Sequence, residues 1–399
     1  MAINMIPVDE ARKLILENTN ILPAVWLPLQ KALGLVSAAD IFSTIDIPSY
    51  PQSSMDGYAI SFAGWQKNKT LTIEGESAAG MSESITLMPE KAVRIFTGAP
   101  VPSGADTVVM QEKTKIENGL LIIDDNKLET GLNVRPKGSE IRDGELALSK
   151  NSILSPAAIG FLASIGDTEV NVYPSPRVSI IITGNELQQP GEPLQYGQVY
   201  DSNSFALKFA LQQAGIHYIY VLYAEDKLDI LSGALNSALH QSDVVLLTGG
   251  ASVGDYDFVT QAADDCGVET IFHKIKQRPG KPLFFGKRGN KIVFGLPGNP
   301  ASVLTCFYEY VAPTLAQMSK KIFKLQNINV PLAKAFKKTA GLTHFLKGYY
   351  NGETVTALHA QESYRLSSFA QANCLVQINE DTTECKEGEL VEIHLLPYL

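Results

Sequence analysis

The hydrophobic and polar positions between residues 177 and 320 alternate between two kinds of segment. Short, nearly continuous apolar runs such as 178–183 and 244–247 are typical of strands buried on both faces of a sheet. Between them, segments such as 204–214 and 228–239 place apolar residues at helical spacing. Further strands are expected at 217–224, 270–275, 283–285 and 292–294, and further helices at 258–266 and 300–316. The alternation predicts an open, mainly parallel α/β sheet with helices on both faces.

The rest of the chain carries other patterns. Residues 7–18 and 155–163 have the starts and apolar spacing of helices, residues 58–140 are rich in short β-type runs, and the segments after 320 alternate as half-buried strands. The Pro-rich piece 46–51 is a connector. We expect four parts: a small N-terminal α+β linking domain (1–45 and 141–173, its helix packing on the α/β domain), a β-rich inserted domain (46–140), the α/β domain (174–320) and a C-terminal β-barrel-like module (321–399).

Several loops should meet at one rim of the α/β sheet, because ligands of such sheets bind beyond the carboxyl ends of the strands. The loops are Gly-rich at 248–257 and 295–300, where backbone N–H groups can approach an anion closely. They also bring together four acids, Glu186, Asp226, Asp255 and Asp257, and a basic run that includes Lys274, Arg278 and Lys281. Acids and bases on one rim suit a divalent metal together with a polyanionic ligand.

Each of these features has a plainer interpretation. A Gly-rich turn followed by aspartates can be an ordinary turn with solvated side chains, and a lone acid at a strand end is commonly a helix cap. The lysines can be a solvated edge that blocks aggregation. Asp56 before Gly57 is usual for a turn, and the stiff loop 97–106 can be a wide turn or can present Thr97 to a ligand. The convergence of four acids beside two Gly-rich turns favours a site.

Composition narrows the class of protein. The chain has 399 residues with 45% hydrophobic and 19% charged residues, enough for several packed domains. A formal net charge of −9 argues against an extended nucleic-acid surface. The four cysteines show no metal-ligand spacing and no disulfide framework, which fits a reducing cytosol. No signal peptide and no apolar run of membrane-spanning length is present, so we expect a cytoplasmic protein without membrane or nucleic-acid partners.

Six motifs occur in the order found in the molybdopterin molybdenumtransferases, the molybdenum insertases of molybdenum-cofactor synthesis, which are related to the C-terminal part of gephyrin. They are Ser54–Tyr58, Thr97–Pro100, Thr183–Leu187, Thr248–Asp257, Pro279–Pro282 and Gly295–Pro300. The chain resembles this family over nearly its whole length. The resemblance implies a transferase that takes adenylylated molybdopterin and molybdate, inserts molybdenum at the dithiolene and releases AMP with Mg²⁺. It also implies that the α/β domain is similar to molybdopterin adenylyltransferase, the enzyme that is a further expected partner.

The resemblance implies a homodimer with a composite cleft, in which Asp56 and Thr97 of one subunit approach the acids of the other. The residues expected to carry the chemistry are Asp56, Thr97, Glu186, Asp226 and Asp257, of which Glu186, Asp226 and Asp257 would hold the metal. The residues expected to bind substrate are Thr248, Gly249, Gly250, Ser252, Lys274, Arg278, Lys281, Pro297, Gly298, Asn299, Pro300, Lys347 and Ser363. Lys347 and Ser363 follow only from where the family has contacts on its C-terminal module.

Some positions depart from the commonest family pattern. Asn185 stands where Asp is frequent, Glu225 replaces the first acid of a frequent Asp pair, Arg278 stands in place of Lys, and Lys347 in place of Arg. The last two changes keep charge but alter forked hydrogen-bond geometry, so they bear on affinity more than on reaction type. Two alternatives remain open: an ATP-dependent molybdopterin adenylyltransferase, and a non-catalytic scaffold on the same fold.

Overall fold

The computed structural model describes residues 5–81, 83–249, 258–321 and 325–397. The chain divides into two compact units, one formed by residues 1–26, 34–36 and 171–399 and the other by residues 27–33 and 37–170. The boundary falls within the strands of a three-stranded sheet, β1 (Val25–Pro28), β13 (Glu169–Tyr173) and β2 (Val36–Ser37). Among the described residues, no helix has the length and apolar character that crossing a lipid bilayer requires.

The first unit is built on a mixed sheet whose described part has the strand order β17-β14-β18-β22-β21-β19. The strands are β14 (Val178–Thr183), β17 (Ile219–Ala224), β18 (Val244–Thr248), β19 (Glu269–Lys274), β21 (Pro282–Arg288) and β22 (Lys291–Leu296). The first four in the order are parallel, and β21 is antiparallel to both of its neighbours. The predicted mainly parallel α/β sheet is therefore confirmed.

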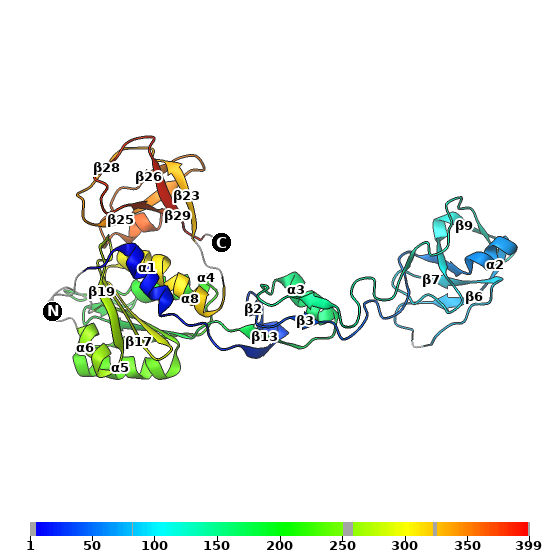
Figure 1. Ribbon diagram of the computed structural model, residues 1–399, viewed down its shortest axis with the longest axis horizontal. Coiled ribbons are helices and arrows are strands. Elements are labelled where there is room, and N and C mark those ends of the chain that lie inside the picture. Colours follow the sequence, from blue (N-terminus) through cyan, green and yellow to red (C-terminus); the bar gives the residue numbers. More distant parts are fainter. Residues whose placement is uncertain (1–4, 82, 250–257, 322–324, 398–399) are drawn as a thin grey trace. The chain divides into compact units, whose positions relative to one another are not determined.

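Helices cover both faces of this sheet (Figure 1). On one face Ile180 and Ile182 pack with α1, α4 and the last helical stretch, and on the other Ile181 packs with α5 and α6. The helices are α1 (Val8–Glu17), α4 (Asn203–Gln213), α5 (Leu228–Gln241), α6 (Phe258–Asp265), α7 (Pro300–Cys306), the π-helix η3 (Phe307–Val311) and α8 (Ala312–Met318). The alternation of side chains along β14 thus gives one apolar core on each face.

The C-terminal module belongs to the same unit and is mostly β. Its main sheet has the order β20-β25-β27-β29-β23, with β26 on β25. The strands are β20 (Gln277–Arg278), β23 (Gln326–Pro331), β25 (Thr343–Tyr350), β26 (Val355–Ala357), β27 (Cys374–Ile378) and β29 (Leu390–Leu395); β24 (Phe336–Lys337), β28 (Glu384–Cys385) and helix α9 (Leu366–Phe369) complete it. Strand β20 comes from the α/β part of the chain and pairs parallel with β25.

The second unit contains the predicted β-rich module. Its six-stranded sheet has the order β8-β5-β7-β6-β10-β9 in the described residues. The elements are β5 (Gly57–Ile60), α2 (Phe62–Lys67), β6 (Thr70–Ser77), β7 (Lys91–Ile95), β8 (Thr107–Met110), η2 (Gln111–Lys113), β9 (Thr114–Glu117) and β10 (Leu120–Ile123). Shorter elements are η1 (Leu29–Lys31), β3 (Ile41–Phe42), β4 (Gln52–Ser53), β11 (Val134–Arg135), β12 (Leu146–Leu148) and α3 (Pro156–Ser164).

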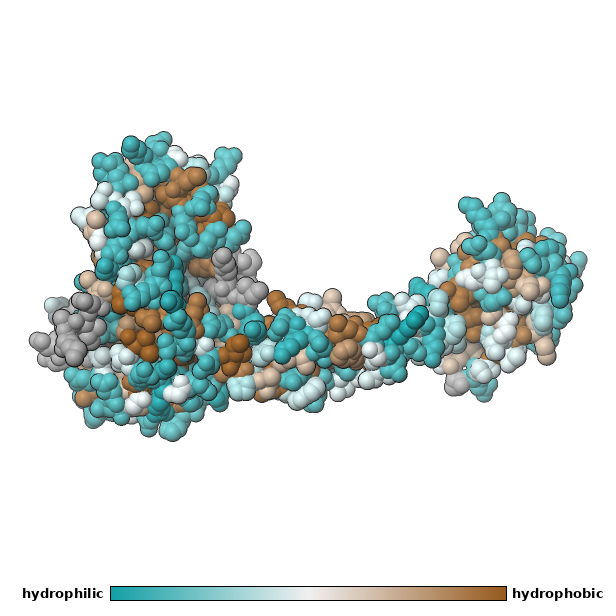
Figure 2. Space-filling model, viewed as in Figure 1, coloured by the Kyte–Doolittle hydropathy of each residue, from teal (hydrophilic) through white to brown (hydrophobic). Residues whose placement is uncertain are grey.

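Hydrophilic side chains cover most of the face shown in Figure 2, and hydrophobic ones lie in separate patches. One group of exposed aromatic side chains lies on α4 and the edge strand β17, which pack beside each other. Its members are Phe205 and Phe209 on α4 and Tyr223 on β17. Several large exposed apolar side chains on neighbouring elements are typical of a protein–protein contact surface.

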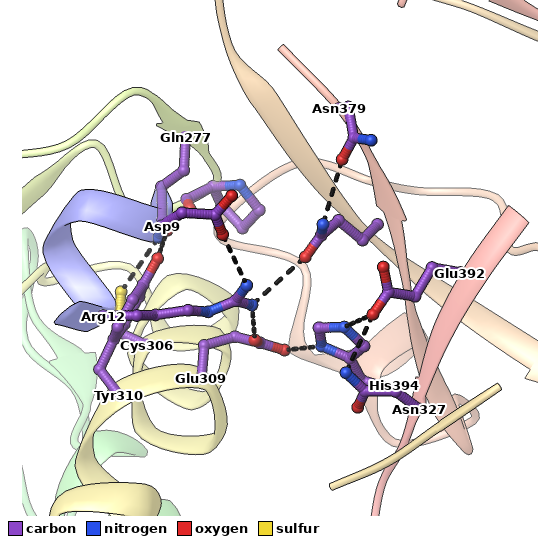
Figure 3. Close-up of polar contacts among 12 residues, drawn as sticks. Asp9, Arg12, Gln277, Cys306, Glu309, Tyr310, Asn327, Asn379, Glu392 and His394 are labelled. Atoms are coloured by element: carbon purple, nitrogen blue, oxygen red, sulfur yellow. Dashed lines mark hydrogen bonds and ion pairs between the residues drawn. The ribbon is translucent and has the colours of Figure 1, made fainter. Parts of the chain in front are cut away.

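An ion pair between the partly exposed Arg12 and the buried Glu309, extended by His394, joins α1, the last helical stretch (α7, η3 and α8) and the C-terminal sheet (Figure 3). The Glu309 carboxylate accepts hydrogen bonds from Arg12 at 2.6 Å, and its other oxygen lies 2.7 Å from Nδ1 of His394. Glu309 lies in the π-helix η3, four residues before Pro313, which has no N–H to donate to the Glu309 carbonyl. The sequence pattern predicted one regular helix here, so the π turn is a feature that the pattern missed.

We expect Glu309→Ala to lower the free energy of unfolding by about 3 kcal/mol, because it leaves the Arg12 cation without its buried partner. Glu17→Ala is the matched control, since the Lys13–Glu17 pair is exposed and 3.8 Å apart. Urea denaturation of both variants measures the difference. Equal, small changes in the two would contradict the structural role of Glu309.

Candidate active site

The ends of four parallel strands define one rim of the α/β sheet. Thr183 pairs with Ala224, and Thr248 with Leu296, so the strands β14, β17, β18 and β22 end together. A cavity of about 980 Å³ lies at this rim. The loops that follow the four strands line it, together with residues 277–282 and the segment 361–364 of the C-terminal module. The rim that the sequence predicted is present in the structure.

The acidic side of the cavity is formed by Glu186 and Asp226. One carboxylate oxygen of Asp226 is buried and has no hydrogen-bond partner among the described residues. Burial, followed by the nearby charge of Glu186, raises the pKa of Asp226 above its ordinary value. Gly184 has φ +146°, and a Cβ there would lie 2.9 Å from both Glu186 carboxylate oxygens. The positive φ favours glycine at this position, and a side chain there would also push the Glu186 carboxylate aside.

These two carboxylates fit a divalent cation. An unpaired buried carboxylate oxygen beside a second carboxylate is unfavourable without a positive charge, and hard cations take oxygen ligands. Within the described ranges, no group of three His, Cys, Asp or Glu side chains suited to a metal occurs. The third predicted ligand, Asp257, lies outside the described residues, as do Asp255 and the predicted substrate contacts Gly250 and Ser252.

Two glycine turns form the floor of the cavity. Gly249 has φ +92°, and a Cβ there would lie 2.1 Å from the Thr183 carbonyl oxygen, so only glycine fits. Thr248 is buried and its hydroxyl donates to the Pro297 carbonyl at 3.3 Å. This bond ties the first turn to the second, whose residues Pro297, Gly298, Asn299 and Pro300 all line the cavity.

Asn203 connects the two turns and was not predicted. Its amide nitrogen donates to the Thr248 hydroxyl at 3.1 Å and to the Gly298 carbonyl at 2.8 Å. Nearby, the buried Asp201 accepts from the Ser204 N–H at 3.0 Å and from the Tyr223 hydroxyl at 3.2 Å. The predicted helix began at residue 204, one position after Asn203. A cap-type Asp201 three residues ahead of Ser204 was the available signal.

The basic side carries Arg278 and Lys281, which are both exposed and line the cavity. Lys274 ends strand β19 and is not among the described residues that line it. Arg278 belongs to β20, so the C-terminal sheet holds one end of this turn. The turn from 277 to 282 is thus anchored on both the α/β domain and the C-terminal module.

Lys347 lies beneath the cavity wall. Its side chain is buried, and its ammonium donates to the carbonyls of Ala360, Glu362 and Arg365 at 2.7, 3.2 and 3.1 Å. Burial lowers the pKa of Lys347. The sequence predicted that Lys347 contacts the substrate, but its ammonium bonds backbone carbonyls instead. It thereby organises the loop that carries Ser363.

Ser363 does line the cavity. Its hydroxyl accepts a hydrogen bond from the Asn299 amide at 2.9 Å, and its carbonyl accepts one from the Ala301 N–H at 3.0 Å. Both bonds join the C-terminal module to the second glycine turn. The cavity therefore has walls from two sheets within one compact unit.

Asp56 and Thr97 lie together on the other unit, and both are exposed. One Asp56 carboxylate oxygen accepts from the Thr97 N–H at 2.7 Å and from the Thr97 hydroxyl at 2.8 Å. These two bonds hold the pKa of Asp56 below its ordinary value. Arg94, which the sequence did not single out, donates to the Gly57 carbonyl at 3.2 Å and stacks over Tyr58. The Asp56 carboxylate is thus ionised and fixed in orientation.

Comparisons with known proteins cover nearly the whole chain. Residues 6–166 match the MoeA N-terminal region (domain I and II), residues 179–317 a probable molybdopterin binding domain, and residues 329–396 the MoeA C-terminal region (domain IV). A protein of Haemophilus influenzae named molybdopterin molybdenumtransferase is 34% identical, with 99% of this chain and 100% of the relative covered. One of the same name from a Nostoc species is 35% identical over 92% of this chain and 88% of the relative.

A solved structure agrees. The crystal structure of a molybdopterin biosynthesis MoeA protein from Pyrococcus horikoshii superposes with a TM-score of 0.83 at 30% identity, and covers 98% of this chain and 99% of that one. Sequence, domain order and fold thus agree along the full length. The chain belongs to the molybdopterin molybdenumtransferase family.

Proposed function

We propose that this chain is a molybdenum insertase of molybdenum-cofactor synthesis: it transfers molybdenum from molybdate into adenylylated molybdopterin and releases AMP. One observation carries the proposal. One large cavity is lined by the carboxylates of Glu186 and Asp226, by the cations Arg278 and Lys281, and by two glycine turns. A nucleotide-bearing pterin phosphate and an oxyanion substrate need these features together.

The glycine turns and the basic turn bind the anionic groups. Gly249 and Gly298 line the cavity and have no side chain of their own, so a phosphate can approach their backbone closely. Arg278 and Lys281 supply charge-assisted hydrogen bonds to phosphate or molybdate oxygens. Lys347 acts indirectly, because it fixes the loop that carries Ser363. In this arrangement the chain binds both anions and orients the pyrophosphate for hydrolysis.

Glu186 and Asp226, together with Asp257, would hold Mg²⁺. Bound there, the ion would neutralise phosphate charge and polarise the phosphoanhydride. The unpaired oxygen of Asp226 and its raised pKa support this assignment, since both reflect a carboxylate that lacks a positive partner. The protein's own contribution is to hold the two carboxylates on neighbouring loops at the same rim of the cavity.

We also propose a homodimer in which Asp56 and Thr97 complete the partner's cavity. The aromatic group on α4 and β17, formed by Phe205, Phe209 and Tyr223, offers an apolar contact surface. Asp56 is exposed, and two hydrogen bonds from Thr97 fix the orientation of its carboxylate. An exposed carboxylate with a fixed orientation suits a site that a second subunit completes.

The activity is tested with two mixtures. Wild-type protein with adenylylated molybdopterin, molybdate and Mg²⁺ should release AMP in a molybdate-dependent manner, and with ATP and free molybdopterin it should not form the adenylylated product. Chromatography of the nucleotides measures both. Product formed only in the second mixture would instead identify an adenylyltransferase.

Removing the Asp226 carboxylate should weaken Mg²⁺ binding. Asp226→Asn should raise the dissociation constant about tenfold or more, because a charged ligand is lost. Isothermal titration with Mg²⁺ measures this without turnover, and Asp229→Asn, an exposed acid on α5 outside the cavity, is the control. An unchanged affinity in Asp226→Asn would remove this residue from the metal site.

The same titration should depend on pH. Because the pKa of Asp226 is raised, its proton competes with the cation at a higher pH than for an ordinary aspartate of pKa about 3.9. The Mg²⁺ affinity of the wild type should therefore fall as the pH drops from about 8 towards about 4. The decrease should begin at a higher pH in the wild type than in Asp226→Asn. Parallel pH profiles for the two proteins would contradict the assignment.

The composite cavity predicts complementation between inactive subunits. Asp56→Asn and Asp226→Asn mixed in equal amounts should recover about a quarter of wild-type activity, since half of the dimers are mixed and each has one intact site. Mixing Glu186→Gln with Asp226→Asn is the control and should recover nothing, because both residues lie on the same unit. Equal results in the two mixtures would exclude a site shared between subunits.

A further inference from the structure

The basic turn at the cavity rests on a buried amide. The side chain of Gln277 is fully buried, and its Nε2 donates to the carbonyls of Pro279 and Gly280 at 2.9 and 3.3 Å. Its other polar atom, Oε1, accepts a short hydrogen bond from the Tyr310 hydroxyl. Two carbonyls of the turn, those of Pro279 and Gly280, are therefore directed at Gln277, whose side chain is held by the Tyr310 hydroxyl and also contacts Cys306 Sγ at 3.5 Å.

Packing leaves this turn little freedom. Gly280 has φ +90°, and a Cβ there would lie 2.6 Å from both Cys306 Sγ and Gln277 Nε2. Tyr310 and Cys306 are buried on the helical stretch below, as Figure 3 shows. The turn is thus in direct contact with the Gln277 amide and the Cys306 thiol. Only a glycine at position 280 allows this contact.

The π-helix η3 directs two neighbouring side chains to different partners. Tyr310 donates to Gln277 under the basic turn, whereas Glu309 pairs with Arg12 and His394 (Figure 3). The ion pair fixes η3 against α1 and the C-terminal sheet, and η3 in turn fixes Tyr310. The position of the hydroxyl that holds Gln277 is therefore set by contacts on three elements.

The flanking residues of the turn are the exposed cations Arg278 and Lys281. A buried amide that bonds two carbonyls between them sets the direction of the backbone from which both cations project. Carbonyl oxygens carry partial negative charge, so carbonyls held on Gln277 cannot turn towards an anion between the cations. An apolar side chain at 277 could fill the volume but could not hold them.

We propose that Gln277, held by Tyr310, is a positioning residue for oxyanion binding: it fixes the turn so that Arg278 and Lys281 converge on molybdate or on the AMP phosphate. The choice of these anions rests on the proposed function. Neither Gln277 nor Tyr310 needs to touch the anion, because both act through the backbone of the turn.

Three variants test this. Tyr310→Phe removes only the hydroxyl, Gln277→Met removes the amide at similar volume, and Gln277→Glu keeps an acceptor for Tyr310 but loses the donors to the two carbonyls. Tyr308→Phe is the matched control on the same π-helix, since its hydroxyl bonds Gln213 at 3.3 Å outside the cavity. Molybdate and AMP are titrated separately into each full-length protein by calorimetry, and melting temperatures are recorded alongside.

Anion affinity should fall about threefold to tenfold in Tyr310→Phe, and about tenfold or more in Gln277→Met and Gln277→Glu, while Tyr308→Phe binds like wild type. In the AMP-release assay, KM for molybdate should rise more than kcat falls, since the loss is in anion binding. A purely structural role would lower the melting temperature without this split between KM and kcat.

Unchanged anion affinity in both Gln277 variants would overturn the proposal. Losses that match those of Tyr308→Phe, or that disappear at a temperature where all variants are fully folded, would overturn it too, as would a wild type that binds neither anion. Failure of the proposed function has a different signature: wild type would bind the anions but release no AMP, and the titrations would still decide the role of Gln277.

Discussion

The common end of four parallel strands is the constraint on which the site depends. Strands β14, β17, β18 and β22 are paired in register by their backbones, and their side chains alternate strictly between two apolar cores. A shift of one residue along any of these strands would move its buried side chains to the wrong face. Register therefore fixes where each strand ends, and the loops carrying Glu186, Asp226 and Gly249 are brought together as a consequence.

The convergence of these loops has an electrostatic cost. It places the carboxylates of Glu186 and Asp226 near each other and buries one Asp226 oxygen that has no hydrogen-bond partner in the described part of the chain. Burial of apolar side chains in the two cores offsets this cost, since β14 and β18 below the rim are buried along their whole length. The positive charge in the cavity comes from a different part of the chain, the turn that carries Arg278. Arg278 is fixed by pairing of β20 with the C-terminal sheet, so the cavity needs both sheets to have an acidic and a basic side.

The sequence predicted those parts of the fold whose signal is local. The apolar run 178–183 and the helical spacing of 228–239 gave elements that the structure confirms within about two residues. The rim acids followed from a general rule about parallel sheets, and Glu186 and Asp226 do line one cavity. By contrast, β20 has only two residues and no periodicity, and its partner β25 lies more than sixty positions away. Such a pairing leaves no local pattern to detect.

Lys347 illustrates why charge in a sequence does not by itself identify a ligand contact. A lysine near an anion site suggests a bond to the anion, yet three backbone carbonyls take up this ammonium. One of them belongs to Ala360, which has φ +61°, a conformation unfavourable for any residue with a Cβ. The hydroxyl of Ser368 donates to the same carbonyl at 2.7 Å. These donors stabilise a loop that would otherwise relax, and the loop presents Ser363 to Asn299. The positive charge thus contributes to the cavity through the backbone it holds, a role that depends on where carbonyls lie in three dimensions and not on the residue type at position 347.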